Sequence, residues 1–176
     1  MRAGLATLVG TCALVALVSS SRAAQAEAKK RRCKCPPPSG LYVGVDAGEA
    51  LRLASALDPV GGAPSFGVRA GYLFRSGLAL DLRADDLGLE DAAGVLRAGG
   101  LGLRYTLPGP VRPFAEVHAG AAGYVGFVLA AECGAGLAVP VGRHVLLEWA
   151  ARDWIADLDG SVRHVPAFTA GLTVGF

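Results

Sequence analysis

Glu116 and His118, two residues that could move a proton, are separated by one residue in the sequence. In an extended strand such residues point to the same side, so this pair could serve as a general base and its partner. A hydrolase would also need a hydroxyl nucleophile within reach of the imidazole. The serines after residue 40 are Ser55, Ser65, Ser76 and Ser161. All four fall in predicted loops, turns or strand starts, so we predict no catalytic residues and expect Glu116 to pair with Arg104 or Arg69 across a lumen.

The cysteines could bind metal or form disulfides. Cys33 and Cys35 form a Cys-x-Cys pair, while Cys133 stands alone. The fourth cysteine, Cys12, falls in a predicted signal peptide, residues 1–26, so the mature chain has three. An odd number excludes a complete disulfide framework, although a redox or intermolecular link stays open. A zinc site needs about four ligands, and no second Cys or His pair has a suitable spacing. Gly94 to Gly102 alternates like a strand and opens no helix, which excludes a phosphate loop. We predict no metal and no other cofactor.

Acidic residues cluster in the segments predicted to be outer loops. They are Asp58, Asp86, Glu90, Asp91, Asp157 and Asp159. Carboxylates at such a rim could bind divalent cations shared with lipopolysaccharide phosphates, or could be ordinary solvated loop charge.

Three regions organise the chain of 176 residues. Arg2 followed by the apolar run 5–18 and the small residues Ala24 and Ala26 is typical of a signal peptide, predicted as residues 1–26. The apolar run is too short for a membrane-spanning helix, which needs about 20 residues. Residues 27–39 are a basic, cysteine- and proline-rich linker, predicted to be extended and solvated. Residues 40–176 are predicted to be a single β-domain.

Period-2 alternation runs through eight segments of this domain and assigns two faces to each. One face is apolar, as in 78–84, where Leu78, Leu80 and Leu82 alternate with Asp81 and Arg83. The other face carries glycine and isolated charges of nearly balanced sign. Its ionisable residues, predicted to form an ion network, are Asp46, Arg69, Asp81, Arg83, Arg104, Glu116, His118, Glu132, Glu148 and Arg152.

Composition indicates which face is inside. Hydrophobic residues make up 52% and charged residues 18% of the chain, with 25 glycines. This excludes disorder and coiled coils, and a net charge of +2 gives no reason to expect nucleic acid. Glycine and paired charges fit a narrow lumen, whereas the apolar face would then meet lipid, where closed barrels satisfy the backbone of every strand. We therefore predict an all-β, eight-stranded antiparallel up-and-down transmembrane β-barrel.

Connections and aromatic residues support this interpretation. Short joints are predicted at 75–76, 108–110 and 140–142, and longer outer loops at 49–64, 86–93, 122–126 and 154–163. Short periplasmic turns alternating with longer outer loops are typical of a transmembrane barrel, and an even strand number returns both termini to the periplasm. Aromatic residues fall in two groups near the strand ends, with Trp149 and Trp154 in the outer one, as expected for interfacial girdles.

The end of the chain resembles the C-terminal strand of bacterial outer-membrane proteins. The matching residues are Phe168, Ala170, Leu172, Val174 and the final Phe176. Residues 110–120 also resemble the proline, aromatic and small-residue strand of small OmpA-like and OmpX-like barrels. The resemblance covers residues 40–176. It implies export to the outer membrane, recognition of the last strand by the barrel assembly machinery, and contact with outer-membrane lipid.

We therefore predict an outer-membrane barrel of the cell envelope with a side-chain-filled lumen and a structural or surface-interaction role through its outer loops. One alternative is a narrow, porin-like pore or a small-ligand transport barrel. Others are a lipid-modifying enzyme and a soluble periplasmic barrel. No nucleic acid partner is expected, since the basic linker lacks aromatic residues.

Overall fold

The computed structural model describes residues 39–55, 58–91, 94–124, 126–158 and 160–176. The predicted signal segment 1–26 and linker residues 27–38 lie outside the described residues. No helix within the described ranges is long and apolar enough to span a bilayer.

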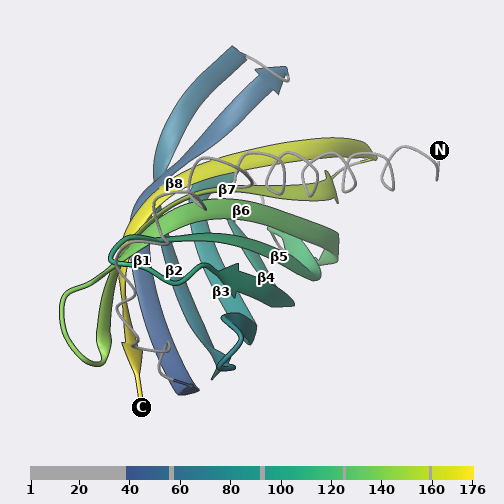
Figure 1. Ribbon diagram of the computed structural model, residues 1–176. Helices are drawn as coiled ribbons and strands as arrows, with labels where there is room; N and C mark the ends of the chain where they lie inside the picture. Colours follow the sequence, from purple (N-terminus) through teal and green to yellow (C-terminus); the bar gives the residue numbers. More distant parts are fainter. Residues whose placement is uncertain (1–38, 56–57, 92–93, 125, 159) are drawn as a thin grey trace, which may run out of the picture. The chain divides into compact units, whose positions relative to one another are not determined.

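Eight antiparallel strands form a closed barrel in which each strand pairs with the next and β8 pairs with β1 (Figure 1). The strands are β1 (Gly40–Ser55), β2 (Asp58–Leu73), β3 (Leu78–Asp91), β4 (Gly94–Thr106), β5 (Arg112–Gly123), β6 (Val128–Pro140), β7 (Val145–Leu158) and β8 (Ser161–Gly175). The β1–β8 seam runs from Tyr42 opposite Gly175 to Ala50 opposite Ala167. The predicted fold class is confirmed.

The two ends of the barrel differ in how the strands are joined. At the end that holds Gly40 and Phe176, here called the terminal rim, the links are residues 74–77, 107–111 and 141–144. At the far end, strands extend through most of the predicted loops 49–64, 86–93 and 154–163, leaving links of two residues. The prediction of long outer loops is therefore wrong for these three segments, because they continue as paired strands. The fourth predicted loop, 122–126, corresponds to the β5–β6 link at residues 124–127. The β1–β2 hairpin projects furthest, beyond the last β2–β3 pair at Phe66 and Asp86 (Figure 1).

The outward face next to the terminal rim is apolar. Leu41 and Leu82 are 65% and 62% exposed, which a water-soluble barrel would avoid on so many neighbouring strands. This surface ends at a polar belt, defined by Glu49, Asp86, Arg97, Asp153 and His164. Below the belt, the outward side chains that the structure describes are apolar or aromatic, apart from glycine and Cys133.

The height of this apolar surface fits a bilayer. The stretch from the terminal rim to the belt covers residues 41–49 of β1, 78–86 of β3, 97–105 of β4 and 145–153 of β7. Each stretch has nine residues, close to the roughly 9–11 that a tilted strand uses to cross a membrane. We call the part of the barrel between the terminal rim and the belt the membrane section, and the belt together with the part beyond it the far section.

In the far section a cluster of apolar side chains points inward. Leu87, Leu96 and Trp154 are at most 2% exposed and belong to one hydrophobic cluster that fills this part of the lumen. The other buried members are Ala50, Leu89, Ala98, Ala122, Ala130, Ala156, Val165 and Ala167. This cluster, here called the apolar plug, corrects the prediction that Trp154 belongs to an outer aromatic girdle. Trp149, on the same strand, does face outward and is 49% exposed.

Candidate functional site: the charged lumen

The membrane section of the lumen contains the ten ionisable residues predicted to share its interior. Nine of them are less than 9% exposed, and the side chain of Asp46 is 6% exposed. They come from seven strands, β1 to β7. Because no water can solvate each charge separately in such a space, each must be neutralised by its neighbours.

Arg152 of β7 links three acids in the middle of the lumen. Its Nε donates a hydrogen bond of 2.5 Å to Oε1 of Glu116. The guanidinium is also 3.4 Å from carboxylate oxygens of Asp46 and Glu132 and donates to the hydroxyl of Thr169. The expected partners of Glu116, Arg69 and Arg104, lie further away, at 3.7 and 3.9 Å. Arg152 is therefore the closest partner of Glu116.

Nearer the terminal rim, Arg69 and Arg104 share one carboxylate oxygen. Oε2 of Glu148 accepts a hydrogen bond from Arg69 and one of 2.9 Å from Nη1 of Arg104. Arg69 also donates to Thr173 at 2.6 Å, and the Arg104 guanidinium lies 3.6 Å from the centre of the Phe114 ring. A stacked, weakly hydrated guanidinium suits such a buried position better than an ammonium group would.

Toward the polar belt, Arg83 joins two strands. Its guanidinium donates to Asp46 at 2.9 Å and to both oxygens of Asp85, at 2.6 and 2.8 Å. Asp85 also accepts a hydrogen bond of 3.1 Å from the indole nitrogen of Trp154. Asp85 therefore connects the charged lumen to the apolar plug.

His118 does not contact Glu116 in the way that a catalytic pair would. Its Nε2 lies 2.8 Å from Oδ1 of Asp81, and its Nδ1 lies 3.5 Å from Glu132. The hydroxyl of Tyr42 donates to the second oxygen of Asp81 at 2.5 Å. The imidazole is thus held between two carboxylates from different strands.

Gly102 is what leaves room for this ring. It lies opposite His118 on the neighbouring strand, and a Cβ at this position would be 2.2 Å from the imidazole. It would also be 2.3 Å from the carbonyl oxygen of Val117. A glycine is therefore required by a close approach and not by backbone conformation.

Several residues of the lumen were not predicted from the sequence as members of the network. Asp85 continues the alternation of Asp81 and Arg83 and could have been found from that signal. Thr169 and Thr173 lie on the face that alternates with Phe168 and Leu172, so their position was predictable but their bonds to Arg152 and Arg69 were not. The sequence does not indicate that Trp154 faces the lumen, because a tryptophan near the end of a strand is also typical of an interfacial aromatic girdle.

The remaining predicted features occupy other places. On β8, Phe168 is 58% and Leu172 is 44% exposed on the outward face. Ala170 and Val174 alternate with them on the same face, and the terminal Phe176 is 74% exposed. Cys133 faces outward on β6, whereas Cys33 and Cys35 lie outside the described residues. Within the described part of the chain, no group of three or more His, Cys, Asp or Glu side chains could hold a metal ion.

Of the acidic residues predicted to line the outer rim, Asp86 faces outward and lies 3.8 Å from Arg97. Asp157 is exposed near the end of β7. Asp159 and the side chains of Asp58, Glu90 and Asp91 lie outside the described part of the structure.

The fold is similar to that of solved outer-membrane barrels. Neisserial surface protein A has a TM-score of 0.60 and 23% identity, covering 78% of this chain and 98% of the other. The N-terminal β-barrel domain of OprF from Pseudomonas aeruginosa has a TM-score of 0.55 and 15% identity, with coverages of 79% and 100%. OprG from the same organism has a TM-score of 0.52 and 12% identity, with coverages of 78% and 96%.

No protein-family description matches the sequence, and no curated protein is significantly similar to it. Together with the apolar membrane section, the similar structures define the class: this chain is an eight-stranded β-barrel of the bacterial outer-membrane type. The predicted resemblance to small outer-membrane barrels is confirmed at the level of fold.

Proposed function

We propose that the protein is a non-conducting barrel of the outer membrane, and that its far section acts as a structural or surface-interaction element at the cell exterior. The observation that supports this most strongly is the filling of the lumen. Asp81 is 1% exposed within the charged lumen, and Leu96 and Trp154 are 1% and 2% exposed within the apolar plug. An ion would have to cross both regions in turn.

The far section fits an exterior role because it carries charge on its outward face. Asp86, Arg97 and Asp157 face outward there, while the apolar plug stabilises the strands that present them. Strands with charged outward faces and an apolar interior can remain folded in water, beyond the lipid headgroups. The proposed partners also include outer-membrane lipid around the membrane section. The barrel assembly machinery, acting on residues 168–176 at the end of β8 and of the chain, completes them.

Planar-bilayer recording of the refolded mature protein tests this proposal. We expect no unitary current steps from the parent protein. Trp154→Ala combined with Glu116→Ala and Arg152→Ala should produce a measurable leak, because it removes the largest side chain of the plug and an ion pair of the charged lumen. Trp149→Ala, on the lipid-facing side of the same strand as Trp154, should not. A steady open current from the parent would contradict the proposal and support the narrow-pore alternative.

We further propose that Glu116 and His118 stabilise the lumen and catalyse nothing. Their closest partners are Arg152 and Asp81, and the structure gives no serine or threonine hydroxyl within hydrogen-bond distance of His118 among the described residues. Glu116→Gln and His118→Gln should therefore leave the lipid A composition of expressing cells unchanged. An altered lipid A profile that depends on either residue would support the lipid-modifying enzyme instead.

A further inference from the structure

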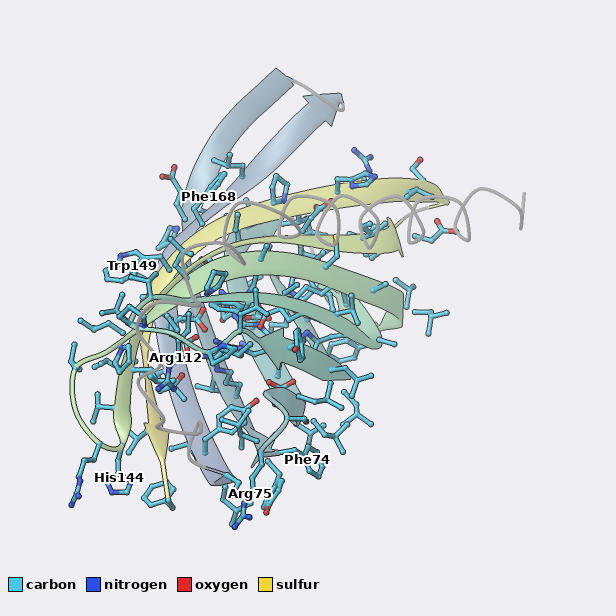
Figure 2. The ribbon with its side chains drawn as sticks, viewed as in Figure 1. Phe74, Arg75, Arg112, His144, Trp149 and Phe168 are labelled. Atoms are coloured by element: carbon cyan, nitrogen blue, oxygen red, sulfur yellow. The ribbon has the colours of Figure 1, made fainter. Side chains whose placement is uncertain are left out.

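A cavity of about 70 Å³ lies at the terminal rim of the barrel, below the charged lumen. Its polar lining includes Arg104, Arg112, Arg143, His144 and Glu148, together with Thr173. Figure 2 shows His144 at this end of the barrel, with Phe74 and Arg75 of the β2–β3 turn at the same end. The hydrogen bonds and ion pairs described above assign no role to this cavity.

Positive charge dominates the cavity. Three arginines face a single acidic side chain, Glu148, which is already shared by Arg69 and Arg104. The three turns of the terminal rim, residues 74–77, 107–111 and 141–144, contain no acidic residue. The cavity therefore favours an anion, and planar guanidinium groups bind carboxylates and phosphates with particular strength.

Glu148 adds a second requirement. Both arginine hydrogen bonds go to its Oε2, while its Oε1 is buried and has no hydrogen-bond partner in the described structure. A buried oxygen left in this state is costly, so a ligand with an N–H or O–H group would gain from it once the carboxylate turns this oxygen toward the cavity. The preferred ligand is thus an anion that also donates a hydrogen bond.

Size limits the ligand further. One water-sized group needs about 10–15 Å³, so this space holds about five to seven such groups. A tetrahedral oxyanion has five non-hydrogen atoms and a phosphoethanolamine group has eight, whereas a nucleoside has many more. The apolar rim residues Leu41, Val145 and Phe176 also line the cavity and extend onto the outward, lipid-facing side.

We propose that this cavity binds a phosphate group that carries a hydrogen-bond donor. The source is either a free hydrogen phosphate ion or the phosphoethanolamine headgroup of a lipid at the terminal rim. Arg112 and Arg143 hold the phosphate oxygens, Arg104 closes the inner side, and Oε1 of Glu148 accepts from the donor. The proposal does not depend on the exterior role of the far section.

Calorimetry in maltoside micelles, which contain no phosphate, tests the free-ion source. Inorganic phosphate should bind to the parent protein with saturation, and sulfate, which has no proton at neutral pH, about tenfold more weakly. The double variant Arg112→Gln/Arg143→Gln should lose about tenfold or more in phosphate affinity. Arg75→Gln is the matched control, since Arg75 belongs to the same rim but does not line the cavity; it should bind as the parent does.

Native mass spectrometry from nanodiscs tests the lipid source. Phosphatidylethanolamine, which has N–H donors, should be retained over phosphatidylcholine, which has none, and the double variant should lose this preference while Arg75→Gln keeps it. Binding in either experiment with this variant pattern supports the site and identifies its source. The proposal is overturned by saturable binding of neither probe, or by equal losses in Arg75→Gln and the double variant. Equal binding of sulfate and phosphate, or of the two lipids, overturns the role of Glu148.

Discussion

The membrane section and the far section are built from the same eight strands but have opposite polarity. In the membrane section, leucines such as Leu80 and Leu82 face outward and charges such as Asp81 and Arg83 face the lumen. On the same β3 strand in the far section, Asp86 faces outward and Leu87 is buried inside. The inversion shows that the surroundings of each section, lipid or water, determine which side chains face the lumen. Lipid drives charge inward, and water drives apolar groups inward.

The first prediction, with the largest expected effect, removes a charge from each section. Arg152→Met leaves Glu116, Asp46 and Glu132 without their shared partner and should lower the free energy of unfolding by about 3–5 kcal/mol. Arg97→Met removes an arginine whose side chain is 68% exposed, so its effect should be about 0–1 kcal/mol. Urea unfolding in lipid vesicles measures both. Similar losses for the two variants would mean that the lumen charges are solvated.

The second prediction adds a charge to the outward face of each section. Leu80→Arg or Leu103→Arg, which lie opposite each other on β3 and β4, should cost about 2–4 kcal/mol in lipid vesicles. Val162→Arg, on the outward face of β8 in the far section, should change stability by only about 0.5 kcal/mol, because it meets water beside Asp157. If the leucine variants are as stable as the parent protein, the outward face of the membrane section does not contact hydrocarbon.

The third prediction concerns the packing of the charged lumen. Gly102→Ala forces a methyl group against the His118 ring and the Val117 carbonyl and should destabilise the barrel by about 1–3 kcal/mol. Gly126→Ala is the control, since a Cβ there would contact nothing within 4 Å. Its expected change is below about 0.5 kcal/mol. Equal stability of Gly102→Ala and the parent would show that the ring has more room than the structure gives it.

The same inversion of polarity explains which part of the fold can be predicted from the sequence. In β3 the apolar residues occupy even positions up to Ala84 and odd positions from Leu87, and in β7 they change from odd to even between Ala151 and Trp154. Because the alternation of apolar and polar residues in the sequence breaks at these points, it predicts that the strands end there. In β3 the alternation of buried and outward side chains continues from Asp81 to Leu89, although the pairing with β4 shifts register between Asp86 and Glu90. In β7 the pairing with β8 is regular. Only the side preferred by apolar residues changes. A change of phase flanked by acidic residues could therefore have predicted the polar belt.

The candidate site was predictable in its members but not in its contacts. Period-2 alternation is sufficient to assign Glu116, His118 and Arg152 to the lumen, because every second residue of a strand points to the same side. Which charges meet depends on strand register and on reach across the barrel. Arg152 of β7 contacts Glu116 of β5, two strands away, and no local pattern encodes that distance.

Fluorescence quenching by brominated acyl chains tests the inversion of polarity most directly, because the chain has only two tryptophans, one on each side of the wall. The variant Trp154→Phe keeps only the outward Trp149, and Trp149→Phe keeps only the plug residue Trp154. In vesicles that contain brominated lipid, we expect strong quenching of Trp149 and almost none of Trp154. Equal quenching of the two, or stronger quenching of Trp154, would contradict a barrel with lipid outside its membrane section and an apolar plug inside its far section.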